Sequence, residues 1–329
     1  MHKKHLVLIL LIVLPFLWAT LATPSPVRAA TITVDSLADN TTADGDCTLR
    51  EAIQNANDDA ATFSDCVAGT GADIIDFGGA AASGTITFTT VSEIFVTDPD
   101  GLTIDGGDDI VLDGGGSPAG TRLFTVGGSG DLTLDAITLQ NGYSPGSGGA
   151  INVQTANSVL TITNSSILNN ISGNDGGAIV SSGSLTITDT VFNGNEADDD
   201  GGAIYQSSSV SMTVTTSAFI NNRAGVVSDA DGSSGGAIFH NGALSGPSAI
   251  SASYFLNNQV DNADNADGGG AIYHGTLGIL SIGASIFLGN NADGDDARGG
   301  AVYNNSGDDA AMVVNYSHFG EFLGVALPP

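Results

Sequence analysis

Two short motifs alternate along the second half of the chain, and their spacing limits the folds that it can adopt. One motif is Gly-Gly-Ala followed by Ile or Val. The other is a large apolar residue, usually Phe, with Asn three positions later. The last residues of successive Gly-Gly-Ala motifs lie 25 to 34 positions apart. This period predicts a solenoid in which each repeat forms one coil and the loops differ in length.

The apolar positions inside a repeat alternate as they do in a β-strand. Leu185 and Ile187 are two positions apart, so their side chains point to the same face. Phe192 is five positions after Ile187, and it can keep that face only if the chain turns a corner. A hydroxyl residue, Thr190 in this copy, stands where the corner is expected. We therefore predict an all-β parallel β-helix with coils about 4.8 Å apart.

Four kinds of recurring residue should stack from coil to coil: the glycine pairs, the apolar residue that ends each Gly-Gly-Ala motif, the phenylalanines and the asparagines. They are Gly176, Gly177, Ile179, Phe192, Asn195, Gly201, Gly202, Ile204, Phe219, Asn222, Gly235, Gly236, Ile238, Phe255, Asn258, Phe287 and Asn290. The asparagine tolerates the left-handed turn conformation and can stack its amide along the axis. The glycines give the permissive backbone needed to enter the next strand.

The two motifs resemble those of polymorphic outer membrane proteins, and they recur in register over residues 132–322. The resemblance implies a right-handed β-helix of the pectin-lyase-like class, and it implies no particular activity. The pattern changes at both edges. In Leu132–Gly142 the asparagine comes one place early, and Phe322 stands where the last asparagine is expected.

Residues 1–29 have the pattern of a secretory signal peptide. The basic segment Met1–His5 precedes an apolar run, Leu6–Leu21, and Val27–Ala29 fits a small-x-small cleavage site. We predict cleavage before Ala30 and export of the chain. An uncleaved membrane anchor is the alternative.

Residues 30–70 differ in composition from the repeats and contain a helical pattern. Thr48 and Glu51 match a capping box, and Leu49 and Ile53 begin the apolar face of a two-turn helix. An open β-helix exposes unpaired strand edges and apolar core at its end. We therefore expect this helix to form an N-terminal cap.

Cys47 and Cys66 are the only cysteines, and they bracket the predicted helix. In an exported protein we expect a disulfide between them, with two free thiols as the alternative. The run Cys47–Ala52, Cys-Thr-Leu-Arg-Glu-Ala, resembles the CSLREA domain with Thr in place of Ser. That resemblance implies export and a following β-helix, which we place over residues 71–329. We expect Arg50 and Glu51 to serve as a surface ion-pair residue and a cap partner.

The charge balance excludes several kinds of partner. After removal of residues 1–29 the chain has four arginines, no lysine and 36 acidic residues, a net charge of −32. It should bind neither nucleic acid nor an anionic membrane surface. Acidic loops such as Asp198–Asp200 and Asp293–Asp296 suit weak calcium binding, although none matches an EF-hand. No other cofactor is expected.

A polysaccharide lyase or glycoside hydrolase is the alternative function. A lyase of this class uses an Arg or Lys base, but Arg223 and Arg298 fall in loops of variable length. A hydrolase needs two carboxylates about 5–10 Å apart on rigid strands, whereas the acids here cluster in loops. His240 and His274 each follow a Gly-Gly-Ala strand by two residues. We expect them to face solvent, with a stacked pair that forms a metal site as the alternative.

We therefore predict a non-catalytic, monomeric β-helix, secreted or at the cell surface, that displays its loops for adhesion. Its expected partners are extracellular glycans or surface proteins. No catalytic, cofactor-binding or metal-binding residue is assigned. A purely structural passenger is also left open, as is the choice between a freely secreted product and a shortened copy of a longer surface protein.

Overall fold

The computed structural model describes residues 29–89, 92–207, 210–226, 232–241, 247–261, 268–275, 278–294, 297–305 and 311–320. The predicted signal segment up to Arg28 lies outside the described residues, as does Phe322. Several predicted acidic loop positions also lie outside them, at 227–231, 262–267 and 295–296.

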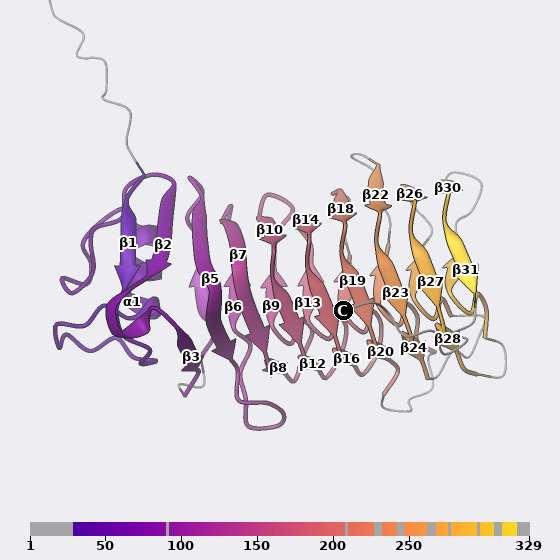
Figure 1. Ribbon diagram of the computed structural model, residues 1–329, viewed down its shortest axis with the longest axis horizontal. Coiled ribbons are helices and arrows are strands. Elements are labelled where there is room, and N and C mark those ends of the chain that lie inside the picture. Colours follow the sequence, from indigo (N-terminus) through magenta and orange to yellow (C-terminus); the bar gives the residue numbers. More distant parts are fainter. Residues whose placement is uncertain are drawn as a thin grey trace, which may run out of the picture.

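The described residues form a right-handed parallel β-solenoid of about eight turns with very little helix. Figure 1 shows the coils side by side along the long axis, from the indigo N-terminal coils to the yellow C-terminal ones. Equivalent positions of successive coils pair in parallel, as Ile204 does with Ile238. The predicted parallel β-helix is confirmed.

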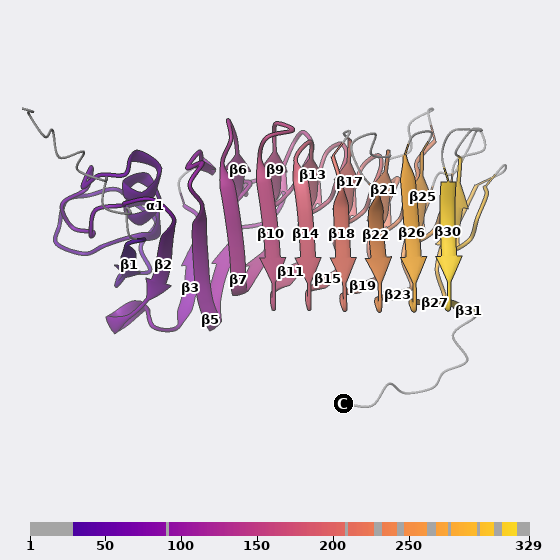
Figure 2. The ribbon, with the colours of Figure 1, turned by 90° about the horizontal axis from the view of Figure 1, so that it is seen from above.

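The strands form three sheets, which we call sheet one, sheet two and sheet three. Sheet one has two strands in each regular coil. Figure 2 shows that the equivalent strands of neighbouring coils, such as β10, β14 and β18, run in the same direction. It contains β1 (Thr31–Val34), β2 (Asp73–Phe77), β3 (Gly84–Thr87), β5 (Leu102–Asp113), β7 (Asp131–Gln140), β10 (Val159–Thr163), β11 (Ser166–Leu168), β14 (Ser184–Thr188), β15 (Val191–Asn193), β18 (Met212–Thr215), β19 (Ala218–Ile220), β22 (Ser248–Ser251), β23 (Tyr254–Leu256), β26 (Ile279–Gly283), β27 (Ile286–Leu288), β30 (Ala311–Asn315) and β31 (His318–Gly320).

Sheets two and three have one strand per coil. Sheet two contains β8 (Tyr143–Ser144), β12 (Ile171–Ser172), β16 (Glu196–Ala197), β20 (Arg223–Ala224), β24 (Gln259–Val260) and β28 (Asn291–Ala292). Sheet three contains β4 (Ile94–Val96), β6 (Phe124–Val126), β9 (Ile151–Val153), β13 (Ile179–Ser181), β17 (Ile204–Gln206), β21 (Ile238–His240), β25 (Ile272–His274) and β29 (Val302–Asn304).

A corner between the two sheet-one strands of a coil accounts for the odd spacing before each Phe. Asp189 lies between β14 and β15 and has a left-handed φ of 49°. Ile187 before the corner and Phe192 after it therefore both face the interior, where both are fully buried. The predicted corner is confirmed, and the residue that makes it precedes the hydroxyl residue Thr190.

Stacking of the phenylalanines produces a continuous core. The rings of neighbouring coils lie 4.7 to 4.9 Å apart between centroids and within 6° of parallel, from Phe192 to Phe319. One cluster of buried apolar residues extends from Ile32 to Phe287. The irregular early strands β2 to β6 therefore share one core with the regular repeats.

The repeated asparagines form a ladder along the axis. The side-chain amide of each of the first four members donates a 2.9 Å hydrogen bond to the side-chain oxygen of the next Asn. The members are Asn170, Asn195, Asn222, Asn258 and Asn290. The expected left-handed conformation belongs to the residue before each of them, such as Asn221 with a φ of 53°. The Asn itself must point inward to reach its neighbour, so the preceding residue makes the bend.

The two glycines of each pair have different roles. Gly201 has a φ of 67°, which other residues rarely adopt. A Cβ atom on Gly202 would collide with the carbonyl oxygen of Gly236 in the next coil. The first glycine thus permits the turn, and the second permits close backbone approach between coils.

Helix α1 (Leu49–Asp58) lies at the N-terminal end of the solenoid (Figure 1). The predicted capping box is present, because Thr48 accepts from the Glu51 N–H and the Glu51 carboxylate accepts from the Thr48 N–H. Leu49 and Ile53 are buried in the same core cluster as the repeats. A disulfide joins Cys47 to Cys66, and a single turn of 3₁₀ helix, η1 (Gly79–Ala81), follows β2.

Candidate functional site

Each coil has two corners of constant length and two connections of variable length. Two residues separate β14 from β15, and two also separate β18 from β19. By contrast, the connection from sheet two to sheet three has six residues between β16 and β17 but thirteen between β20 and β21. The connections flanking sheet three are therefore the variable surface of the molecule.

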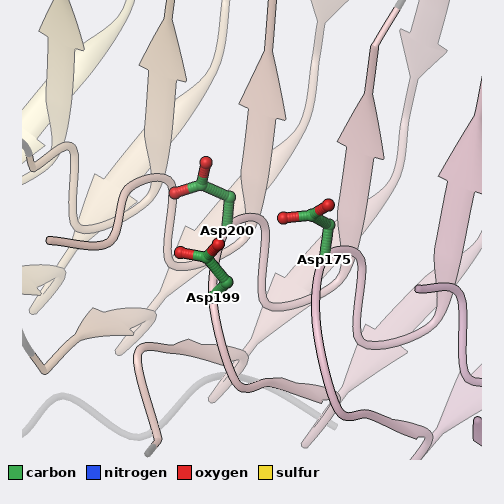
Figure 3. Close-up of side chains that lie close together, drawn as sticks. All are labelled: Asp175, Asp199 and Asp200. Atoms are coloured by element: carbon green, nitrogen blue, oxygen red, sulfur yellow. The ribbon is translucent and has the colours of Figure 1, made fainter. Parts of the chain in front are cut away.

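Three carboxylates gather on two of these connections. Asp175 lies on the connection before β13, while Asp199 and Asp200 lie on the connection before β17. One oxygen from each lies within 4.8 Å of the others. Figure 3 shows Asp175 on one loop, with its carboxyl group directed toward the neighbouring loop that carries Asp199 and Asp200. We call these three residues the acidic cluster.

Partial burial and nearby charges shift the pKa values of two residues at the cluster, Asp175 and Tyr205. Burial raises the pKa of Asp175, and hydrogen bonds from the Asp200 backbone and the Ser147 side chain oppose that rise. Burial, together with the charges of Asp175, Asp200 and Asp199, raises the pKa of Tyr205 to about 12. The neighbouring phenol therefore remains neutral, and the carboxylate oxygens of the cluster are of the kind that a hard cation such as Ca²⁺ prefers.

The sequence identified only part of this cluster. It singled out Asp198–Asp200, but the third ligand comes from Asp175, 24 to 25 positions before Asp199 and Asp200. Asp175 directly precedes Gly176, as Asp200 directly precedes Gly201. This shared position before the glycine pair is the signal that would have found Asp175.

The two arginines considered for catalysis lie in different settings. Arg223 begins β20, so its predicted placement in a variable loop is wrong. It directly follows Asn222, the ladder residue that occupies the corner, and is the first residue of the strand. Its guanidinium pairs with the carboxylate of Asp261 in the next coil. Arg298 forms an isolated bridge with Gly268, and its Nη1 lies 3.3 Å from the Tyr303 hydroxyl.

The predicted solvent exposure of His240 and His274 is also wrong. Both side chains are completely buried, and the two residues pair in register. His240 is two positions after Ile238, so strand alternation places both side chains on the inner face. The two rings are neighbours, as the alternative required, but they are tilted by 32° and not stacked in parallel, with ring centroids 5.1 Å apart. His318 is exposed.

An aromatic row on the outer face of sheet three was not predicted. The rings of Tyr205, Phe239 and Tyr273 stack with centroids 4.7 Å apart, and Tyr303 lies 5.7 Å from Tyr273 at an angle of 57°. All four residues directly follow the Ile or Val of a Gly-Gly-Ala motif, which is the signal in the sequence. Because the stacked faces cover one another, the row presents mainly ring edges.

The coil that contains Asp199 and Asp200 also matches a known repeat family. Residues 189–207 match the family profile of the Chlamydia polymorphic membrane protein repeat. This repeat runs from the corner residue Asp189 through Asn195 and the acidic loop to just beyond β17. No curated protein and no solved structure matched the chain.

The repeat and the solenoid together point to a bacterial β-helix protein of the surface or outer membrane. Within the part of the chain that the structure describes, no helix is long and apolar enough to cross a membrane.

Proposed function

We propose that this chain is an exported, non-catalytic β-helix that mediates adhesion through the connections flanking sheet three. The observation that carries the proposal is the contrast between constant corners and connections of six to thirteen residues. Loops held on a rigid scaffold can change without disturbing the core, and binding surfaces are commonly built in this way. The proposed partners are extracellular glycans or surface proteins, contacted by a monomer.

Three features of the N-terminal region support export. They are the signal-like segment 1–29, the resemblance of Cys47–Ala52 to the CSLREA domain, and a disulfide, which is typical of oxidising compartments. We also assign α1 the role of an N-terminal cap and the solenoid to the pectin-lyase-like class. Burial of Leu49 and Ile53 against the core supports the first assignment, and the three parallel sheets support the second.

Weak calcium binding at the acidic cluster forms part of the proposal. Carboxylate oxygens are suitable Ca²⁺ ligands, and three of them converge here. Calcium would order the connections before β13 and β17 relative to each other, and thereby the surface that they present.

A polysaccharide panel tests adhesion against the enzyme alternative. The exported protein is incubated with immobilised neutral and acidic polysaccharides, and both retention and released sugar ends are measured. Retention without product is expected. Product release that is abolished by Arg223→Ala or Arg298→Ala would favour the polysaccharide-active enzyme.

An exchange of connections locates the binding surface. The thirteen residues between β20 and β21 are replaced by the six residues between β16 and β17. The variant should keep its circular dichroism spectrum and melting temperature but lose retention on the polysaccharides, or on cells, that hold the unmodified protein. Unchanged retention would place adhesion elsewhere.

A further inference from the structure

The third residue of each sheet-three strand forms an inward-facing column whose chemistry changes along the axis. Its buried members, in coil order, are Val96, Val126, Val153, Ser181, Gln206, His240 and His274, whereas Asn304 in the last described strand is exposed. The early positions are apolar, whereas the later ones are polar. His240 and His274 are fully buried, with no exposed surface. Two titratable groups therefore lie inside the wall of the later coils, at a position filled by valine in the earlier ones.

Hydrogen bonds connect the pair to a neighbouring coil. The Met212 N–H donates to the Ser248 Oγ at 3.0 Å, and that hydroxyl lies 2.8 Å from the His240 Nε2. The two Nδ1 atoms lie 3.0 Å apart, so one of them carries a proton and donates it to the other.

This arrangement accommodates two neutral rings and no additional charge. An extra proton would place a positive charge on a fully buried ring, and the 3.0 Å contact between the two Nδ1 atoms has room for only one proton, so both rings cannot become charged while it persists. The described positions around the pair are Gln206 on β17, Ser248 on β22 with its register partner Leu280 on β26, and Asn304 on β29. None of them carries a charge that could balance an imidazolium.

Burial opposes protonation of both rings. Burial, and secondarily the proximity of His274, lowers the pKa of His240 to about 3. Burial is also the main cause of the lowered pKa of His274. An unfolded histidine has a pKa of about 6.5. Because the folded values are lower, the stability contributed by the neutral pair is complete above about pH 6.5 and falls as the pH drops below it.

We propose that the His240–His274 pair is an acid-sensitive switch that opens the wall of the later coils. Neutral rings hold β21 and β25 in register, and proton uptake in acid releases them while the earlier coils remain closed. Because the pKa of His240 in the folded protein is about 3, this residue makes opening up to about tenfold more favourable per pH unit below 6.5, and His274 adds an effect of the same sign. Val126, Val153 and Ser181 give the earlier coils no such response. This inference is independent of the proposed adhesive function.

Hydrogen exchange measured by mass spectrometry tests the switch within one molecule. Between pH 6.5 and 5, after correction for intrinsic exchange, protection over 232–241 and 268–275 should fall by about tenfold or more relative to residues 124–163. The double variant His240→Gln/His274→Gln, which installs the residue present at Gln206, should lose this difference. His318→Gln, at an exposed site, should behave like the unmodified protein. A double variant with the unmodified pH response, or equal pH responses in the two regions, would overturn the proposal.

Histidine ring NMR on the unmodified protein decides the matter if the double variant does not fold at pH 7.5. Two buried rings should keep the chemical shifts of neutral imidazole as long as signals of the folded later coils persist. Titration of those two rings near pH 6.5 in a protein that stays folded would show that the interior accepts the charge, and the proposal would then be wrong.

Discussion

The two sides of each coil differ in how they are linked to the next coil. On the sheet-one side, side chains join the coils at both corners. The Ser217 hydroxyl donates to the Thr215 carbonyl at 2.8 Å and accepts the Thr190 N–H at 3.2 Å, and Asn222 occupies the second corner. On the sheet-three side, the connections carry the acidic cluster and differ in length.

This difference shows why insertions are confined to one side of the coil. An extra residue at a ladder corner would shift a buried hydroxyl or amide away from its partners, leaving donors unsatisfied. An extra residue beside sheet three needs only solvent around it. The constant side therefore fixes the register, and the variable side is available for recognition.

The largest effect should come from the core that both sides share. Ile204→Asp places an unpaired charge at a fully buried position, and we expect a loss of more than about 4 kcal/mol in the free energy of unfolding. Chemical denaturation followed by circular dichroism measures it. Asp199→Asn, on the variable side of the same coil, should change stability by less than about 0.5 kcal/mol. Equal stabilities of the two variants would contradict the coil register.

The asparagine ladder should come next. Asn222→Leu leaves the backbone N–H and side-chain amide of Asn195 without their acceptor, both within 3.1 Å of the Asn222 oxygen. Each buried unsatisfied donor costs about 1–3 kcal/mol, so we expect a loss of roughly 3–4 kcal/mol. Asn152→Leu is the matched control, because Asn152 points outward from β9 and is only half-buried. A similar loss in both variants would mean that the ladder contributes little.

Reduction of the disulfide should have a smaller and more local effect. Cys47 and Cys66 are 19 residues apart, and a loop of this size corresponds to about 3 kcal/mol. A reductant, or the variant Cys47→Ser/Cys66→Ser, should expose the N-terminal region to protease while the repeats stay resistant. Two alkylatable thiols in the native exported protein would refute the bridge.

Calcium should give the smallest effect, on the variable side alone. The carboxylate oxygens of the acidic cluster lie within 4.8 Å of one another, well inside a Debye length of about 8 Å. Millimolar calcium should raise the melting temperature by roughly 2–4 °C near neutral pH, with a weaker response to sodium chloride. Asp199→Asn should reduce the response, whereas Asp108→Asn, at an exposed position in the irregular middle of β5, should not. A melting temperature indifferent to calcium and chelator would exclude this site.

Local patterns predicted much of the fold. Alternation of Leu185 and Ile187, the five-residue step to Phe192, and the capping box at Thr48 each depend on neighbours within a few residues, and all appear as predicted. The candidate sites were predicted less well. Arg223 was placed in a loop although it begins a strand, and Asp175 was not recognised as a partner of Asp199.

What the sequence determined by itself is the coil: its period, its corners, its inward positions and its glycine turns, because these follow from strand alternation and backbone sterics over a few residues. Only the tertiary structure decided which groups meet between coils. Asp261 reaches Arg223, and His240 shares a hydrogen bond with His274, across connections of different lengths. The physical reason is register. Connection length varies from coil to coil, so sequence separation does not identify the partner of a side chain. The amide and hydroxyl ladders of the constant side align the coils and bring those groups together.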